Sequence, residues 1–180
     1  MSAIRKLSVA ASLAAVLAIP AAVRAADATV KEAEHAVTAI LAADSGQQTF
    51  LDHAAGYAVF PDVAKGALVV GGAGGTGWVF EHGKPVGTTS LSQVTVGAQI
   101  GGQAYSEIIY FENQATLEAF KKGEWTMTAQ VSAVALASGA SANAKYKHGV
   151  AVFTLTKGGA MAEAAIGGQK FSYAAMPKKS

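Results

Sequence analysis

The stretch Gln93-Val94-Thr95-Val96-Gly97-Ala98-Gln99-Ile100 alternates polar or small residues with apolar ones at every step. Successive side chains of a β-strand point to opposite faces, so this period of two gathers valine, alanine and isoleucine on one face. A strand with one apolar and one polar face is typical of an antiparallel sheet that covers a core. The stretch therefore predicts a β-rich fold.

The same period extends over most of the chain after Gly56. Pro61 is expected to end the first strand, because proline lacks the N–H that a sheet ladder uses. Residues 126–144 carry no charge, and their alternation predicts a pair of strands rather than a membrane-spanning helix. The other predicted strands are Tyr57–Phe60, Ala67–Val70, Trp78–Phe80, Tyr105–Phe111, Val150–Thr156, Ala160–Ile166 and Lys170–Ala174.

Two internal sequence repeats support one continuous sheet. Gly56–Phe60 is repeated in similar form as Gly149–Phe153, and Ile100-Gly101-Gly102-Gln103 returns as Ile166-Gly167-Gly168-Gln169. Paired glycines at strand ends permit positive φ, bulges or sharp bends. The repeats predict related hairpins within a single sheet or barrel.

Helices are predicted before and between the strands. Thr29 and Glu32 form a capping-box pattern, and Ser45-Gly46 supplies a stop. The helix between them carries an apolar stripe at helical spacing, made of Val30, Ala33, Val37, Ile40 and Leu41. Shorter helices are expected over Gln47–Ala54 and over Asn113–Lys122, the latter with Asn113 as N-cap and Gly123 beyond its end.

Together these patterns predict the class α+β, with a dominant antiparallel sheet that is either open or barrel-like. N-terminal amphipathic helices precede the sheet, and one helix lies between strands. About 155 residues remain after a predicted leader, which suits a single domain over residues 26–180 with a sizeable core.

The first 25 residues predict a secretory signal peptide. Arg5 and Lys6 precede an apolar run that Pro20 breaks, and small residues follow, with cleavage expected after Ala25 or, alternatively, Ala28. The expected location is the periplasm or the cell exterior. The sequence has no cysteine, so packing rather than disulfides must hold the exported domain.

Loss of residues 1–25 removes both arginines, Arg5 and Arg24, together with Lys6. The remaining chain has 11 lysines against 12 Asp and Glu, a charge of −1. Arginine is the preferred side chain for bidentate recognition of phosphates and bases. Its absence and the near-neutral balance argue against a nucleic-acid partner.

No residue pattern predicts catalysis, a metal or a cofactor. The run Gly71–Gly77 lacks the Lys-Ser/Thr of a phosphate loop, and the strand expected after it makes a glycine hairpin or bend the better interpretation. Four histidines, at positions 35, 53, 82 and 148, show no metal-ligand spacing. Glu107 lies in an apolar strand, where it is expected to face solvent or a lysine; burial would instead raise its pKa.

Several motifs in order resemble the SYLF domain family. They are Gly56–Pro61, Lys65-Gly66 with the following glycines, Val96–Glu107, Ala133–Ala140 and Gly149–Gly168. The resemblance is to the bacterial exported branch, in which the domain stands alone. It implies a β-rich fold with N-terminal helices, and binding of anionic phospholipid through an amphipathic N-terminal helix. Actin, a partner of yeast members, is not expected for an exported bacterial protein.

The leading hypothesis is therefore a non-enzymatic lipid-binding protein that meets anionic phospholipid or a membrane surface. The proposed lipid contacts are the apolar Val30, Val37, Ile40 and Leu41, with Lys31, Lys121 and Lys122 supplying positive charge. Packing of the apolar stripe on the sheet is the competing interpretation. A small outer-membrane β-barrel and a periplasmic protein-interaction module are the alternative functions.

Overall fold

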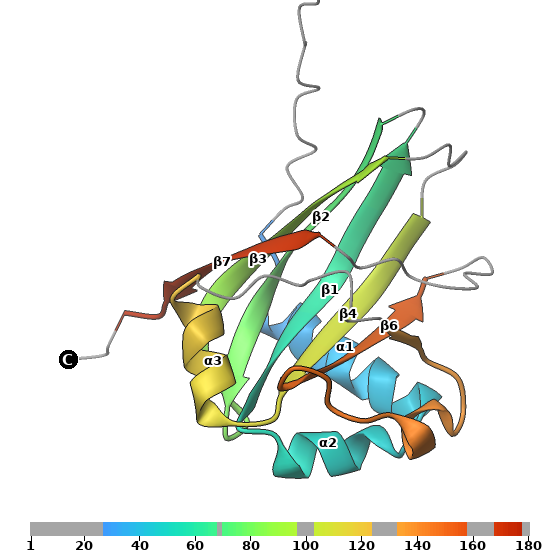
Figure 1. Ribbon diagram of the computed structural model, residues 1–180, viewed down its shortest axis with the longest axis vertical. Helices are drawn as coiled ribbons and strands as arrows, with labels where there is room; N and C mark the ends of the chain where they lie inside the picture. The colour runs from blue at the N-terminus through green and yellow to red at the C-terminus, as the bar shows by residue number, and fades with distance from the viewer. Residues whose placement is uncertain (1–26, 68–69, 97–102, 124–132, 158–167, 178–180) are drawn as a thin grey trace, which may run out of the picture.

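A computed structural model describes residues 27–67, 70–96, 103–123, 133–157 and 168–177 (Figure 1). The predicted leader, residues 97–100 of the first predicted strand, residues 126–132 of the predicted strand pair and the predicted strand Ala160–Ile166 lie outside these residues. The helices are α1 Val30–Ala43, α2 Gln47–His53, α3 Gln114–Lys121 and the short 3₁₀ helix η1 Ala140–Asn143. The strands are β1 Gly56–Ala67, β2 Val70–Glu81, β3 Lys84–Val96, β4 Gln103–Phe111, β5 Val134–Ala135, β6 Val150–Thr156 and β7 Gln169–Ala175.

The strands form one sheet in the order β5-β6-β4-β1-β2-β3-β7. All neighbours are antiparallel except β5 and β6. The described strands do not close into a barrel, because the terminal strands β5 and β7 do not pair with each other. The predicted α+β class with a dominant antiparallel sheet is confirmed, and the sheet takes the open form.

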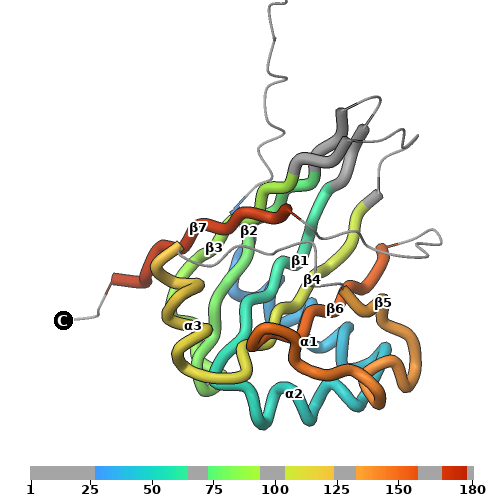
Figure 2. The backbone as a smooth tube through the Cα atoms, in the orientation of Figure 1, coloured from blue at the N-terminus to red at the C-terminus, as the bar shows by residue number. Residues whose placement is uncertain are grey.

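The last strand folds back over the sheet. β7 pairs with β3, yet Figure 1 shows it crossing in front of the long central strands, and Figure 2 shows the same path. Phe171 on β7 contacts Phe60 on β1, with ring centroids 5.8 Å apart, although β2 and β3 lie between these strands in the sheet. The sheet therefore curls strongly toward one side, which we call the inner face.

The sheet separates two hydrophobic clusters. The inner face carries Phe60, Ile109 and Phe111, which are covered by α3 and β7. The other face, which we call the outer face, is covered by α1 and α2, with Ile40 and Phe50 packed near Val59, Ile108 and their neighbours. Strand alternation produces this division, because odd residues of β4 face one cluster and even residues the other.

The predicted helix ends are confirmed in detail. Thr29 accepts a hydrogen bond from the Glu32 backbone N–H at 3.2 Å, and Glu32 accepts one from Thr29, completing the capping box of α1. Asn113 caps α3 by accepting from the Thr116 N–H at 3.0 Å. Gly123 follows α3 with φ +70°, a conformation that glycine adopts without strain.

The prediction that Pro61 ends the first strand is wrong. β1 continues past it to Ala67, and its register shifts between Phe60 and Val63 against β4. Such a shift is a β-bulge, where an unpaired proline is tolerated. The Ser106 hydroxyl donates to the Pro61 carbonyl at 2.7 Å and satisfies an acceptor within the bulge.

The interpretation of Gly71–Gly77 as a hairpin is also wrong. The run Gly71–Gly77 forms no hairpin or turn, because it lies inside the continuous strand β2 and pairs with β3 throughout. Of the strand pair predicted at 126–144, the structure describes only residues 133–144. Only Val134–Ala135 is a strand there, parallel to β6, and η1 follows it.

Candidate functional site

A groove lies between α1 and the outer face of the sheet. Its volume is about 540 Å³, within the range of small-molecule sites. Much of its wall is alanine, because Ala36 and Ala39 of α1 face Ala64 of β1 there. Small side chains at these positions keep the helix from filling the space with its own atoms. The remaining lining residues are Ala28, Glu32, His35, Pro61, Asp62, Thr76, Ser106 and Lys157.

Charged side chains stand at the wall of this groove. Lys157, just after β6, forms an ion pair with Asp62 at 3.0 Å, and both side chains are largely exposed. Exposed pairs of this kind contribute only about 0–1 kcal/mol, so they exchange readily for other partners. His35 is exposed on α1 and lines the same groove. The groove thus combines an alanine-lined floor with charged side chains that can exchange their partner for a ligand.

The inner face holds an unexpected carboxyl group. Glu107 on β4 is fully buried, so the expectation that it faces solvent or a lysine is wrong. Burial raises the pKa of Glu107 to about 7, and a hydrogen bond from Gln169 opposes that rise only in part. The alternation of β4 explains the placement, since Tyr105, Glu107 and Ile109 share the inner face.

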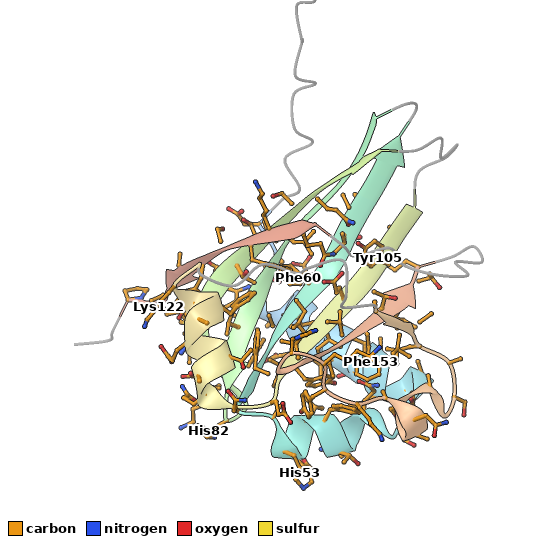
Figure 3. The ribbon with its side chains drawn as sticks, in the orientation of Figure 1. His53, Phe60, His82, Tyr105, Lys122 and Phe153 are labelled. Atoms are coloured by element: carbon orange, nitrogen blue, oxygen red, sulfur yellow. The ribbon has the colours of Figure 1, made fainter. Side chains whose placement is uncertain are left out.

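Two glutamines and a tyrosine accompany Glu107 within the inner face. The Gln169 side-chain amide donates to Glu107 Oε2 at 3.0 Å and also hydrogen-bonds Tyr105. Gln93 on β3 stands opposite Gln169 in the β3–β7 ladder and is buried as well. Burial, followed by the Glu107 charge, raises the pKa of Tyr105, which stays neutral. Figure 3 labels Tyr105 and Phe60, whose strands β4 and β1 line this side.

Sequence reasoning missed Gln169 as a partner of Glu107. The two residues are 62 positions apart and come together only because β7 folds back over the sheet. A signal was present in the repeated Gly-Gly-Gln motif, whose second copy places Gln169 at the start of a strand. A glutamine on the apolar side of a strand indicates a buried polar contact, but not which partner it finds.

The predicted apolar lipid contacts pack on the sheet. Ile40 is fully buried in the outer-face cluster, while Val30 and Val37 are partly buried against the same cluster. Leu41 is half-buried, and Lys31 is exposed. In this structure the apolar stripe of α1 therefore packs on the sheet, as the competing interpretation predicted.

Two of the three predicted cationic contacts, Lys121 and Lys122, lie on the opposite side of the sheet from α1. Lys121 belongs to α3 on the inner face and forms ion pairs with Glu81 and Glu118, the latter at 3.1 Å. Lys122 is exposed next to it, as Figure 3 shows. The structure consequently does not bring Lys121 and Lys122 together with the α1 stripe into one surface.

The histidines show no convergence. All four are exposed, and His53 Nδ1 lies 2.8 Å from the Thr49 carbonyl within α2. Within the described ranges, no group of three or more His, Asp or Glu side chains is arranged to hold a metal ion. In the same residues, no helix has the length and apolar character needed to cross a bilayer.

These features define a class: a small α+β binding domain with an alanine-lined groove on one face of its sheet and a buried polar pair on the other. Residues 92–175 match the model of the Ysc84 family, described as Las17-binding protein actin regulator. This is the SYLF domain family, so the resemblance seen in the sequence is confirmed over these residues.

A bacterial relative agrees with this assignment. The chain is 35% identical over 122 residues to Beta cell expansion factor A of Aeromonas veronii. The similar stretch covers 67% of this chain and 46% of that protein. The chain thus spans about half the length of the curated relative.

Proposed function

We propose that this domain binds phospholipid at the surface of a membrane, with a preference for anionic headgroups. The observation that carries the proposal is the groove beside α1, which joins an alanine-lined floor to Lys157 and His35. An amphiphile needs both an apolar surface for its chain and polar partners for its headgroup. The described part of the molecule combines the two in this groove.

The ion pair in the groove supports a preference for negative charge. Lys157 is held by Asp62 at the surface, where water screens the pair. A phosphate that replaces the Asp62 carboxylate gains a charge-assisted hydrogen bond from the lysine. The lost surface pair costs little, so the exchange favours binding.

The lipid contacts predicted from sequence form a separate proposal. Lys31 and Lys122 are exposed and free to meet anionic lipid, each worth about 1 kcal/mol near a charged bilayer. Contact through Val30, Val37 and Ile40 would require α1 to leave the sheet. Vesicle binding of Lys31→Ala and Lys122→Ala variants tests the charges without disturbing the outer-face cluster.

Flotation with vesicles tests the groove. The chain from residue 26 onward is used, because both hydrophobic clusters consist of residues after that point. It is expected to float with anionic vesicles at low salt and to bind less at high salt, where charges are screened. No binding to anionic vesicles at low salt would remove the proposal.

Two variants that replace an alanine of α1 by tryptophan test where the lipid binds. Ala39→Trp fills the groove, whereas Ala42→Trp places the same side chain on an exposed site of α1 outside the groove lining. Only Ala39→Trp is expected to reduce flotation. Equal effects of the two variants would show that lipid binds elsewhere.

We also propose export to the periplasm or the cell exterior. The support is the basic, apolar and small-residue order of positions 1–25. Such a location would separate the domain from cytoplasmic actin. Mass spectrometry of the protein from a periplasmic extract should show an N-terminus near residue 26, and a full-length cytoplasmic form would contradict it.

A further inference from the structure

The Glu107–Gln169 pair bridges strands that are not neighbours. β1, β2 and β3 lie between β4 and β7 in the sheet, yet the two side chains meet at 3.0 Å. β7 is also an end strand, so in the described residues only β3 supports it through backbone pairing. The contact with β4 therefore joins the folded-back strand to the far side of the inner face.

The hydrogen bonding of this pair is incomplete for an ionised carboxylate. Glu107 Oε1 and Gln169 Oε1 are both buried and both lack a hydrogen-bond partner. Both are acceptors, so neither can satisfy the other. A proton on Glu107 Oε1 supplies the missing donor, and the acid and amide can then pair through two hydrogen bonds.

Within the part of the chain that the structure describes, no cationic side chain lies close enough to compensate an ionised Glu107. The strands packed around it present Phe60 from β1 and Thr154 from β6, which stand opposite it in the ladders, and Gln169 from β7. On β4 itself, the neighbouring Tyr105 is titratable and stays neutral. Ionisation therefore places an unpaired charge in a hydrophobic core, which is costly.

We propose that Glu107 and Gln169 form a proton-dependent clasp, in which protonated Glu107 holds β7 over the inner face and ionised Glu107 weakens that hold. The aromatic contacts beneath β7 are what the clasp protects. Phe171 packs on Phe60 and also on Phe120 of α3, with centroids 5.2 Å apart. Loosening β7 exposes these rings, so the proton controls access to the inner face.

The direction of the pH effect follows from linkage. The raised pKa of Glu107 means that the folded domain binds this proton more tightly than the unfolded chain. The clasp is complete in acid and is lost as the pH rises from the ordinary glutamate range through about 7. Lipid binding at the groove lies on the other face and is not required for this effect.

Hydrogen exchange tests the clasp with a proton mimic. Glu107→Gln keeps the shape, stays neutral and can pair with Gln169 through two amide hydrogen bonds. Exchange of β7 is compared in the two proteins at about pH 4 and about pH 8.5, so that the intrinsic rate cancels at each pH. At the lower pH, β7 is expected to be equally protected in the unmodified protein and in the variant. At the higher pH, β7 of the unmodified protein is expected to be at least about tenfold less protected than β7 of the variant.

Two controls make the result decisive. Glu112→Gln removes an exposed carboxylate just beyond β4 and should leave the pH response of β7 unchanged. α1 serves as an internal reference, and equal loss of protection in α1 and β7 would indicate global unfolding and overturn the clasp. The same pH response in the unmodified protein and in Glu107→Gln would overturn it as well.

A measurement without any variant covers the case in which Glu107→Gln does not fold. The side-chain carboxyl carbon of Glu107 is followed by NMR as the pH is raised. A midpoint near 7 supports the clasp. A midpoint in the ordinary glutamate range near 4.5 would refute it.

Discussion

Gly77 of β2 lies against the backbone of Val59 in β1, with no room for a Cβ atom beside the Val59 carbonyl oxygen. The close approach falls next to the bulge that carries Pro61, where β1 shifts its register. The glycine run of β2 thus serves a packing need at this point. It lets two strands come together where one of them is irregular.

Gly77→Ala should therefore destabilise the domain. The methyl group meets backbone, which cannot move aside as a flexible side chain would, and overpacking typically costs about 1–3 kcal/mol. Gly74→Ala is the matched control, because its Cβ would sit 3.6 Å from the Leu91 carbonyl, an ordinary contact. Urea unfolding measures both. Equal loss of stability in the two variants would show that the close approach is not the cause.

Asp44 is expected to stabilise the connection between α1 and η1. Its Oδ2 accepts from the buried Ser141 N–H at 2.7 Å, across 97 positions in the chain. Asp44→Ala leaves that N–H unsatisfied and should cost about 1–3 kcal/mol. The exposed Asp52→Ala on α2 is the control and should cost less in the same unfolding measurement.

The same residue predicts a loss of stability in acid. Burial alone would raise the pKa of Asp44, but hydrogen bonds from Ser141, Gly46 and Gly139 lower it overall. Its contribution is therefore present above the ordinary value of 3.8 and disappears as the pH falls through the lower folded-state value. Thermal melts of the unmodified protein and Asp44→Ala should converge in strong acid, and a constant difference would contradict this.

Lys157→Ala should weaken binding to anionic vesicles. One lysine near a charged bilayer contributes about 1 kcal/mol, so a loss of roughly fivefold in affinity is expected. Lys170→Ala removes an exposed lysine from β7, on the other side of the sheet from α1, and should have little effect. Flotation across a series of lipid concentrations distinguishes them. A larger effect of Lys170→Ala would place the lipid surface elsewhere.

Lys121→Ala should reduce stability more than Lys122→Ala. The Lys121 side chain is 14% exposed and contacts two carboxylates, from Glu81 at the end of β2 and Glu118 on α3. The ion pair with Glu81 joins α3 to the sheet, and its loss should cost about 0.5–1 kcal/mol. Lys122 is exposed and serves as the neighbouring control. Identical melting temperatures for the two variants would show that the ion pair of Lys121 with Glu81 does not stabilise the domain.

Local patterns predicted the elements that local contacts form. Thr29 with Glu32 and Asn113 with Thr116 act within three residues, so their caps were visible in the sequence. The period of two residues predicted strands such as Tyr105–Phe111 and Val150–Thr156, but not the glycine-rich part of β2. The continuation of β1 past Pro61 could not be predicted, because the bulge that accommodates the proline depends on β4, a strand more than forty positions away.

The contact between Glu107 and Gln169 could not be predicted from local sequence patterns. The alternation of β4 placed Glu107 beside Tyr105 and Ile109, but whether that face met water or a core depended on β7 and α3. The predicted lipid residues show the same dependence. α1 and α3 are amphipathic in the same local way, yet the order of the strands set them on opposite faces of the sheet.

The sequence alone therefore determined the α+β class, the helix caps, most strands and the resemblance to the family, because each depends on residues near one another or on motifs read in order. The tertiary structure decided which side chains are buried and which meet. Those outcomes depend on the path of β7 and on the faces that the helices cover, and they arise from contacts between residues far apart in the chain.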